Sequence, residues 1–316
     1  MTKKYTTPKM KSIGYKFGYY VQASRYEGGM VAAVFLLIGE WCAIKSFPFY
    51  STLLAILAVS GIVNSGSWIN YIFDIKLDKF AKKDISFFRY ISSKEMFTAS
   101  FILLLVSSAL LFYINILSFL IGLLTFLTFF TYAVPPIRLK ILPPFDTILN
   151  ALGFGTFPFL LGYTLAVNHL PWISLIRSII LGLPVVSYYL FISIFDIQTD
   201  KEYGIKTSCT ILGFNATIIT SASIFILSVL LSLAFFDLVS VIPISLIICL
   251  PIVVSIMIFK KIPILRILVS CLFLVWAIAV LLFLSVLSSS IITIAMLIII
   301  IIVCLLVIYT YVKENK

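Results

Sequence analysis

The chain has 316 residues, of which 62% are hydrophobic and 11% are charged, and its mean hydropathy is +1.19. A soluble domain carries roughly 25% charged residues, so this composition excludes an ordinary soluble protein. The formal net charge of +11 would suit nucleic-acid binding, but the basic residues gather beside apolar segments, which indicates membrane topology. We therefore predict no nucleic-acid partner.

Apolar segments of about 20 residues follow one another along the chain, and this length is typical of membrane-spanning helices. The predicted fold class is all-α, a multi-pass transmembrane helical bundle of nine to ten spans forming one domain over residues 28–311. A cytoplasmic N-terminal tail is predicted at 1–27 and a cytoplasmic C-terminal tail at 312–316. The predicted spans are 28–44, 49–73, 96–114, 117–134, 146–167, 173–195, 209–236, 238–259, 264–287 and 290–311.

Basic residues are distributed unevenly between the two sides of the predicted bundle. With the N-terminus in the cytoplasm, every Lys and Arg except Lys45 and Arg177 falls on the cytoplasmic side. Such an excess on one side is the positive-inside bias of membrane proteins. The sequence thus predicts a multi-pass protein of the cell membrane, with the lipid bilayer as a partner.

Two sets of polar side chains lie at the cytoplasmic ends of the second and sixth predicted spans. Asn70, Asp74 and Asp78 recur every fourth residue, and Asp196 and Asp200 repeat this spacing. On a helix, side chains four residues apart share a face, where like charges repel each other. A divalent cation removes the repulsion, and Mg²⁺ is commonly held by a few carboxylates together with substrate phosphates. We expect these five side chains to meet at one pocket and bind two Mg²⁺ ions with a diphosphate.

A simpler interpretation treats the first acid pair as loop residues that form ion pairs with nearby lysines. Lys79, Lys82 and Lys83 follow Asp74 and Asp78 closely enough for such pairing. The second acid pair, with the same spacing on the same side, weighs against this interpretation, because acids at a membrane edge are costly and mark function by default.

Cations are predicted at the same face as the acids. Two adjacent prolines in the segment Tyr132–Lys140 stop the fourth span and leave Arg138 and Lys140 there. Fixed cations at this position would hold phosphate oxygens and stabilise a departing diphosphate. Ordinary anchoring of the span ends is the alternative role for each. Further candidates for phosphate binding at this face are Arg25, Arg89 and Lys201.

Together these motifs resemble those of the UbiA superfamily of intramembrane prenyltransferases. Residues 70–78 fit the family motif Asn-x-x-x-Asp-x-x-x-Asp, residues 196–200 fit Asp-x-x-x-Asp, and residues 132–140 resemble Tyr-x-x-Pro-Pro-x-Arg-x-Lys. The resemblance covers roughly residues 20–235. It implies a bundle around a central cavity open toward the cytoplasm, Mg²⁺-assisted loss of diphosphate, and attack by an acceptor on the allylic cation. Three departures from the family pattern are Tyr71 after Asn70, Tyr90 after Arg89, and ten predicted spans where the family is usually described with nine.

The sequence therefore predicts a Mg²⁺-dependent membrane prenyltransferase that moves a polyprenyl group from an isoprenyl diphosphate to an aromatic or lipid acceptor. The four aspartates are the predicted catalytic residues, and Asn70 and the five cations above are the predicted substrate-binding residues. Within the enzyme class, the alternatives are a terpene cyclase of the same family and a transferase that uses phosphoribosyl diphosphate. From another class, a secondary transporter would place its acids near the bilayer midplane in inverted repeats, whereas these acids cluster at one face.

Overall fold

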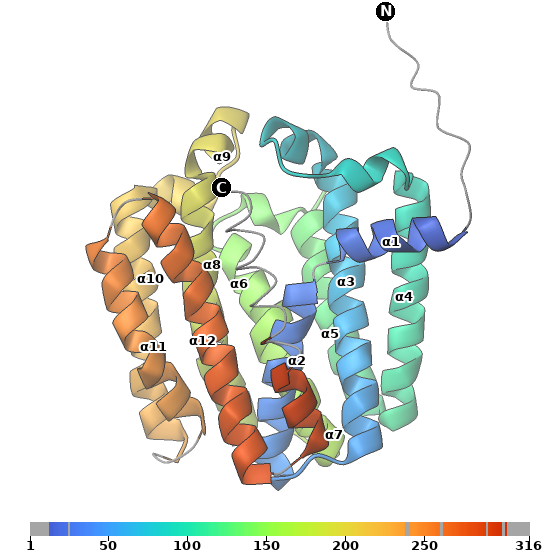
Figure 1. The fold of residues 1–316 in the computed structure, drawn as a ribbon, viewed down its shortest axis with the longest axis vertical. Coiled ribbons are helices and arrows are strands. Elements are labelled where there is room, and N and C mark those ends of the chain that lie inside the picture. The colour runs from blue at the N-terminus through green and yellow to red at the C-terminus, as the bar shows by residue number, and fades with distance from the viewer. Residues whose placement is uncertain are drawn as a thin grey trace, which may run out of the picture.

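The computed structural model describes residues 13–24, 26–237, 241–259, 262–288, 290–298 and 301. In this part of the chain all regular elements are helical, and the long helices run side by side as a bundle (Figure 1). The elements are α1 Ile13–Ala23, α2 Tyr26–Ile44, α3 Phe49–Phe80, η1 Ser86–Arg89, α4 Ser93–Ile114, α5 Ile116–Ala133, η2 Leu139–Ile141, α6 Phe145–Ala151, η3 Leu152–Thr156, α7 Phe157–Ala166, α8 Trp172–Ser193, η4 Ile194–Asp196, α9 Ile197–Tyr203, α10 Ser208–Phe235, α11 Val241–Ile258 and α12 Ile262–Ser288.

Eight helical stretches of the described chain are long and apolar enough to cross a membrane. They are Glu27–Ile44, Phe49–Phe80, Ser93–Ile114, Ile116–Ala133, Phe145–Ala166, Trp172–Tyr203, Ser208–Phe235 and Ile262–Ser288. The eighth predicted span corresponds to the shorter apolar helix Ile242–Ile258. Most of the predicted tenth span, and the C-terminal tail at 312–316, lie outside the described residues.

The second predicted span ends too early, because α3 continues past residue 73 to Phe80. Its last two turns are amphipathic: Asp74 and Asp78 are buried, whereas Lys76 and Lys79 are exposed. This pattern follows the period of a helix, so the turns remain helical although their mean hydropathy falls. The acids of the first motif therefore belong to the helix and face into the protein, and the interpretation of Asp74 and Asp78 as loop residues is wrong.

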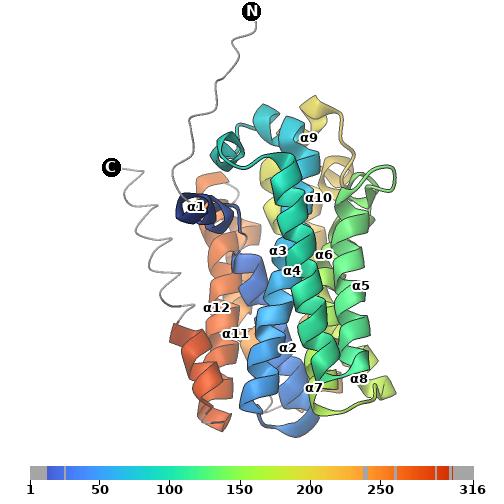
Figure 2. The ribbon, with the colours of Figure 1, turned by 90° about the vertical axis from the view of Figure 1, so that its right-hand side faces the viewer.

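The end of α3, the α5–α6 loop and α9 lie at the same end of the bundle, here called the motif end (Figures 1 and 2). Helix α1 lies across the bundle near this end. Its Tyr19 ring stacks on Tyr90 at a centroid distance of 4.1 Å, and its Lys16 forms an ion pair with Glu95. Glu95 also completes a capping box at the start of α4. Helix α1, within the predicted N-terminal tail, thus packs on the α3–α4 connection.

Helices α2 and α7 cross in close contact through two glycines. A Cβ atom built on Gly162 would lie 1.8 Å from the carbonyl oxygen of Leu36, and one on Gly39 would lie 1.9 Å from that of Phe159. Small residues at helix crossings allow this close backbone approach in membrane proteins. The crossing holds α2 against the span that contains α6, η3 and α7.

The substitution Gly162→Ala is expected to lower the stability of the bundle by about 1–3 kcal/mol, because the methyl group meets backbone that must move. Thermal unfolding of the purified protein in detergent measures this as a lower Tm. The matched control is Gly18→Ala, since an added Cβ there has no neighbour within 4 Å. An unchanged Tm for Gly162→Ala would contradict the described crossing.

Candidate active site

The first motif meets the cations of the α5–α6 loop at the motif end. Lys140 Nζ donates to Asp74 Oδ2 in a short contact and to Asn70 Oδ1 at 3.2 Å. Arg138 Nη2 donates to Asp74 Oδ1 at 3.1 Å. We call these four residues the Asp74 cluster. Both Asp74 and Lys140 are buried, at 5% and 7% exposed, so each charge depends on the other for compensation.

The backbone of the α5–α6 loop explains how both cations reach one carboxylate. Helix α5 ends at Ala133, and the amide of Arg138 bonds to the carbonyl of Val134 at 2.9 Å. Arg138 then adopts a left-handed backbone conformation, with φ 34° and ψ 57°, before the short helix η2. Such a conformation is uncommon for a residue other than glycine. Here it turns the chain so that both Arg138 and Lys140 contact Asp74.

The second motif lies beside the first. Lys83 of the α3–α4 connection forms an ion pair with Asp196 at 3.5 Å, and the rings of Phe80 and Tyr203 are 5.3 Å apart. Lys140 lies within Coulombic range of Asp78 and also of Asp200. Two acid motifs separated by more than a hundred residues are therefore brought to one end of the bundle, with Lys140 near both.

The donor set fits magnesium when a phosphate ligand completes the coordination. Carboxylate and amide oxygens are the side-chain ligands that Mg²⁺ prefers. In the described ranges, no three His, Cys, Asp or Glu side chains are grouped closely enough to hold an ion by themselves. Mg²⁺ is commonly bound through only one or two carboxylates plus substrate phosphates and water. The two motifs thus suit an ion that arrives with a diphosphate.

Two of the other predicted cations are exposed at the motif end, unlike the buried Lys140. Arg89 is exposed in η1, within Coulombic range of Asp84, and Lys201 is exposed on α9. Arg25 lies outside the described residues. The structure therefore brings Arg138 and Lys140 onto the first motif, and it leaves Arg89 and Lys201 on the surface of the motif end.

Asp146 is a further buried acid at this end that the sequence reasoning missed. Its carboxylate accepts hydrogen bonds from the Ser208 amide at 2.8 Å and from the Ser208 hydroxyl at 2.5 Å. This contact satisfies an amide in the first turn of α10, as a capping side chain does. It also holds the segment that follows α9. The signal was present, since Asp146 is another acid at the edge of an apolar segment.

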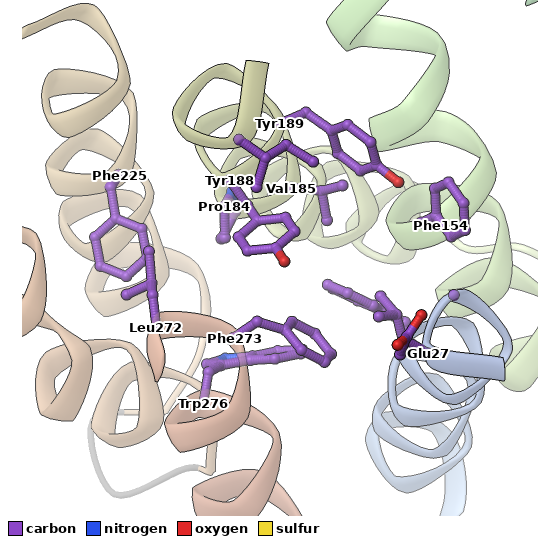
Figure 3. Close-up of a pocket in the computed structure, with 14 residues that line it drawn as sticks. Glu27, Phe154, Pro184, Val185, Tyr188, Tyr189, Phe225, Leu272, Phe273 and Trp276 are labelled. Carbon is purple, nitrogen blue, oxygen red and sulfur yellow. The ribbon is translucent and has the colours of Figure 1, made fainter. Parts of the chain in front are cut away.

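An apolar cavity of about 190 Å³ lies between α2, η3, α8, α10 and α12 (Figure 3). Aromatic side chains form much of its wall, among them Phe35, Phe154 and Trp276. Ile192 of α8 also lines it, and this residue is four positions before Asp196 of the second motif. On α8 the cavity wall therefore ends four residues before the second motif.

The described chain is a multi-pass helical bundle whose two acid motifs and fixed cations lie at one end. The sequence model of the UbiA prenyltransferase family matches residues 32–267. The chain belongs to the UbiA prenyltransferase family, which places it among enzymes that transfer alkyl groups other than methyl. The family resemblance predicted from the three motifs is thereby confirmed. Comparison with curated protein sequences gave no match.

Solved structures share the fold at low sequence identity. A UbiA homologue from Archaeoglobus fulgidus bound to GPP and Mg²⁺ is 17% identical with a TM-score of 0.65, covering 86% of this chain and 100% of that chain. An apo UbiA homologue from Aeropyrum pernix K1 is 18% identical with a TM-score of 0.68, covering 81% of this chain and 96% of that chain. A digeranylgeranylglyceryl phosphate synthase is 20% identical with a TM-score of 0.65, covering 87% of this chain and 100% of that chain. These likenesses confirm the all-α bundle predicted from the sequence.

Proposed function

We propose that this prenyltransferase is Mg²⁺-dependent and transfers a polyprenyl group from an isoprenyl diphosphate to a hydrophobic aromatic or lipid acceptor. The observation that supports it best is the position of Lys140, paired with Asp74 and within Coulombic range of Asp78 and Asp200. An isoprenyl diphosphate has a polyanionic head and an apolar tail. The motif end offers charged groups for the head, and the apolar helices of the bundle offer surroundings for the tail.

The proposed metal ligands are the side chains of both motifs. Asn70, Asp74, Asp78, Asp196 and Asp200 would hold Mg²⁺, with two ions as the proposed number. When bound, Mg²⁺ supplies positive charge that stabilises the diphosphate as a leaving group. The carboxylates in turn fix the head of the donor at the motif end. The homologue from Archaeoglobus fulgidus solved with GPP and Mg²⁺ shares this fold, which agrees with the proposal.

Arg138 and Lys140 have a different role, because they stabilise charge that develops during the reaction. As the bond between the prenyl carbon and the diphosphate oxygen breaks, negative charge accumulates on the departing group. Fixed donors at such a position lower the barrier because they need little reorganisation. Lys140 is buried and Arg138 is partly buried, and both already contact Asp74. Arg89, Lys201 and Arg25 are proposed as outer phosphate contacts.

The orientation in the membrane follows from the distribution of charge. The basic residues of the α3–α4 and α5–α6 connections lie at the motif end, together with those of α9. The positive-inside bias supports placing this end in the cytoplasm. In this orientation a soluble diphosphate product would leave toward the cytoplasm of the cell.

The test is diphosphate release by the purified protein in nanodiscs, with a panel of donors in the presence and absence of Mg²⁺. We expect isoprenyl diphosphates to release diphosphate only with Mg²⁺, and a hydrophobic phenol or alcohol to carry the prenyl group. Product analysis separates transfer from cyclisation, and phosphoribosyl diphosphate tests the alternative donor. Transport of a solute by proteoliposomes without diphosphate release would overturn the proposal in favour of a carrier.

A further inference from the structure

The apolar cavity contains polar groups that the proposed phosphate site does not use. Glu27, an exposed residue in the first turn of α2, lines the cavity together with Tyr188 and Tyr189 of α8. Figure 3 shows the Glu27 carboxylate and the two tyrosine hydroxyls around the same space, opposite the Phe273 ring. Glu27 lies within Coulombic range of Tyr188. An isoprenyl tail has no hydrogen-bonding group, so the Glu27 carboxylate and the Tyr188 hydroxyl at this cavity suit a ligand that carries one.

The charge of the wall restricts what this ligand can be. Among the described residues that line the cavity, Glu27 is the one charged side chain, and no Lys, Arg or His accompanies it. Moving a charge into apolar surroundings without a partner is costly. Binding of an anionic ligand would therefore be weakened by this desolvation cost, and the Glu27 carboxylate would also repel the ligand. The fixed cations Arg138 and Lys140 are instead paired with Asp74 at the motif end.

We propose that Glu27 determines the charge class of the acceptor. The cavity takes an uncharged hydrophobic molecule that bears a hydroxyl group, and Glu27 accepts a hydrogen bond from that hydroxyl. Acceptors that carry a carboxylate or a phosphate in the cavity are disfavoured. The inference rests on the proposed transfer function, since it assigns the cavity to the acceptor. Ile192 of the cavity wall precedes Asp196 by four residues, which supports placing the acceptor on the apolar side of the diphosphate site.

The experiment compares two probes that differ only in charge, 6-hydroxy-2-naphthoate and its neutral carboxamide. Equilibrium dialysis against the full chain in zwitterionic nanodiscs, corrected for empty nanodiscs, gives the two Kd values. We expect the carboxamide to bind about tenfold more tightly. Glu27→Gln should bring the ratio close to one, and Glu27→Lys should reverse the preference. Equal binding of both probes by the unmodified protein would overturn the proposal.

Two control variants separate this role from general effects. Asp237→Asn makes the same change in net charge beyond the end of α10, at the opposite end of the bundle, and should leave the tenfold ratio intact. Tyr188→Phe should weaken the binding of both probes by the same factor, because it removes a hydroxyl without altering the charge. The ratio is taken within each variant, so a partly unfolded preparation does not change it. If Glu27→Gln keeps the original ratio, Glu27 does not set the charge class.

The readout is also independent of catalysis. Probe binding requires neither Mg²⁺ nor a diphosphate donor, so it is measurable even if no donor releases diphosphate. Failure of the donor panel with a normal probe ratio would reject the proposed transferase and keep the charge selection by Glu27. Normal diphosphate release with a probe ratio of one would reject the role of Glu27 and keep the transferase.

Discussion

Asp74→Asn is expected to lower kcat/KM for Mg²⁺-dependent diphosphate release roughly a thousandfold, the scale of losing a key electrostatic group in an active site. Asp74 accepts hydrogen bonds from both Arg138 and Lys140 and lies one turn from Asn70 and from Asp78. An amide in its place keeps the shape but is a weaker ligand for a hard cation. It also leaves the two basic side chains without their carboxylate. Steady-state assays with an isoprenyl diphosphate over a range of Mg²⁺ concentrations measure the loss.

The same substitution also affects folding, and the two effects have to be separated. Removing one partner of a buried ion pair costs about 3–5 kcal/mol, because the other charge stays buried without compensation. The double variant Asp74→Asn with Lys140→Gln removes this excess charge, so we expect it to recover most of the lost Tm and none of the activity. Recovery of both would show that Asp74 has only a structural role.

A matched control is available at the same end of the bundle. Asp84 is exposed and accepts hydrogen bonds from the side chain of Gln22 at 3.4 Å and from the amide of Ser86 at 2.9 Å. Asp84→Asn makes the same chemical change outside both motifs, and we expect activity within about twofold of the unmodified protein. Full activity of Asp74→Asn would contradict the catalytic assignment, whatever the behaviour of Asp84→Asn.

The sequence predicts the local features of the motif end well, because helical spacing is a local property. The four-residue repeat of Asp74 and Asp78 places both on one face, and the structure buries both on α3. The predicted boundary at residue 73 is wrong because mean hydropathy falls where charges begin. The helical spacing of the acids and lysines after residue 73 is the sequence signal for the longer helix.

The partners of these acids depend on contacts that no local pattern encodes. Arg138 and Lys140 reach Asp74 because the α5–α6 loop takes a left-handed turn at Arg138, a conformation that favours glycine. Arg89 carries the same charge, yet it lies exposed in η1. The sequence did not predict Glu27 as a site residue, because its neighbours in the cavity come from other helices far along the chain. Sequence spacing predicts which side chains share a face, and packing decides which faces meet.

Lys140→Gln is expected to lower kcat/KM for an isoprenyl diphosphate by roughly a hundredfold, because it removes a fixed positive charge from the proposed leaving-group site. Lys140 is buried and contacts both Asp74 and Asn70, so water replaces it poorly. Lys140→Arg keeps the charge with a different shape and should recover part of the activity. The comparison of the two variants in the same assay separates charge from geometry.

The pH dependence of kcat/KM tests the same residue independently, because it reports ionisation of the free enzyme. Burial lowers the pKa of Lys140 from its usual value, and the neighbouring Asp74 carboxylate opposes this shift only in part. A lysine acts here in its charged form, so activity is retained below its pKa and lost as the pH rises through it. We expect an alkaline decline in kcat/KM at lower pH than an exposed lysine would give.

Lys140→Arg provides the decisive comparison for this decline, because arginine stays charged over the whole range in which a protein can be assayed. The variant should therefore lose the alkaline decline, or shift it to higher pH, while keeping part of the activity at neutral pH. A decline that is unchanged in Lys140→Arg would assign the titration to another group. Lys140 would then be excluded as the cation whose charge the reaction requires.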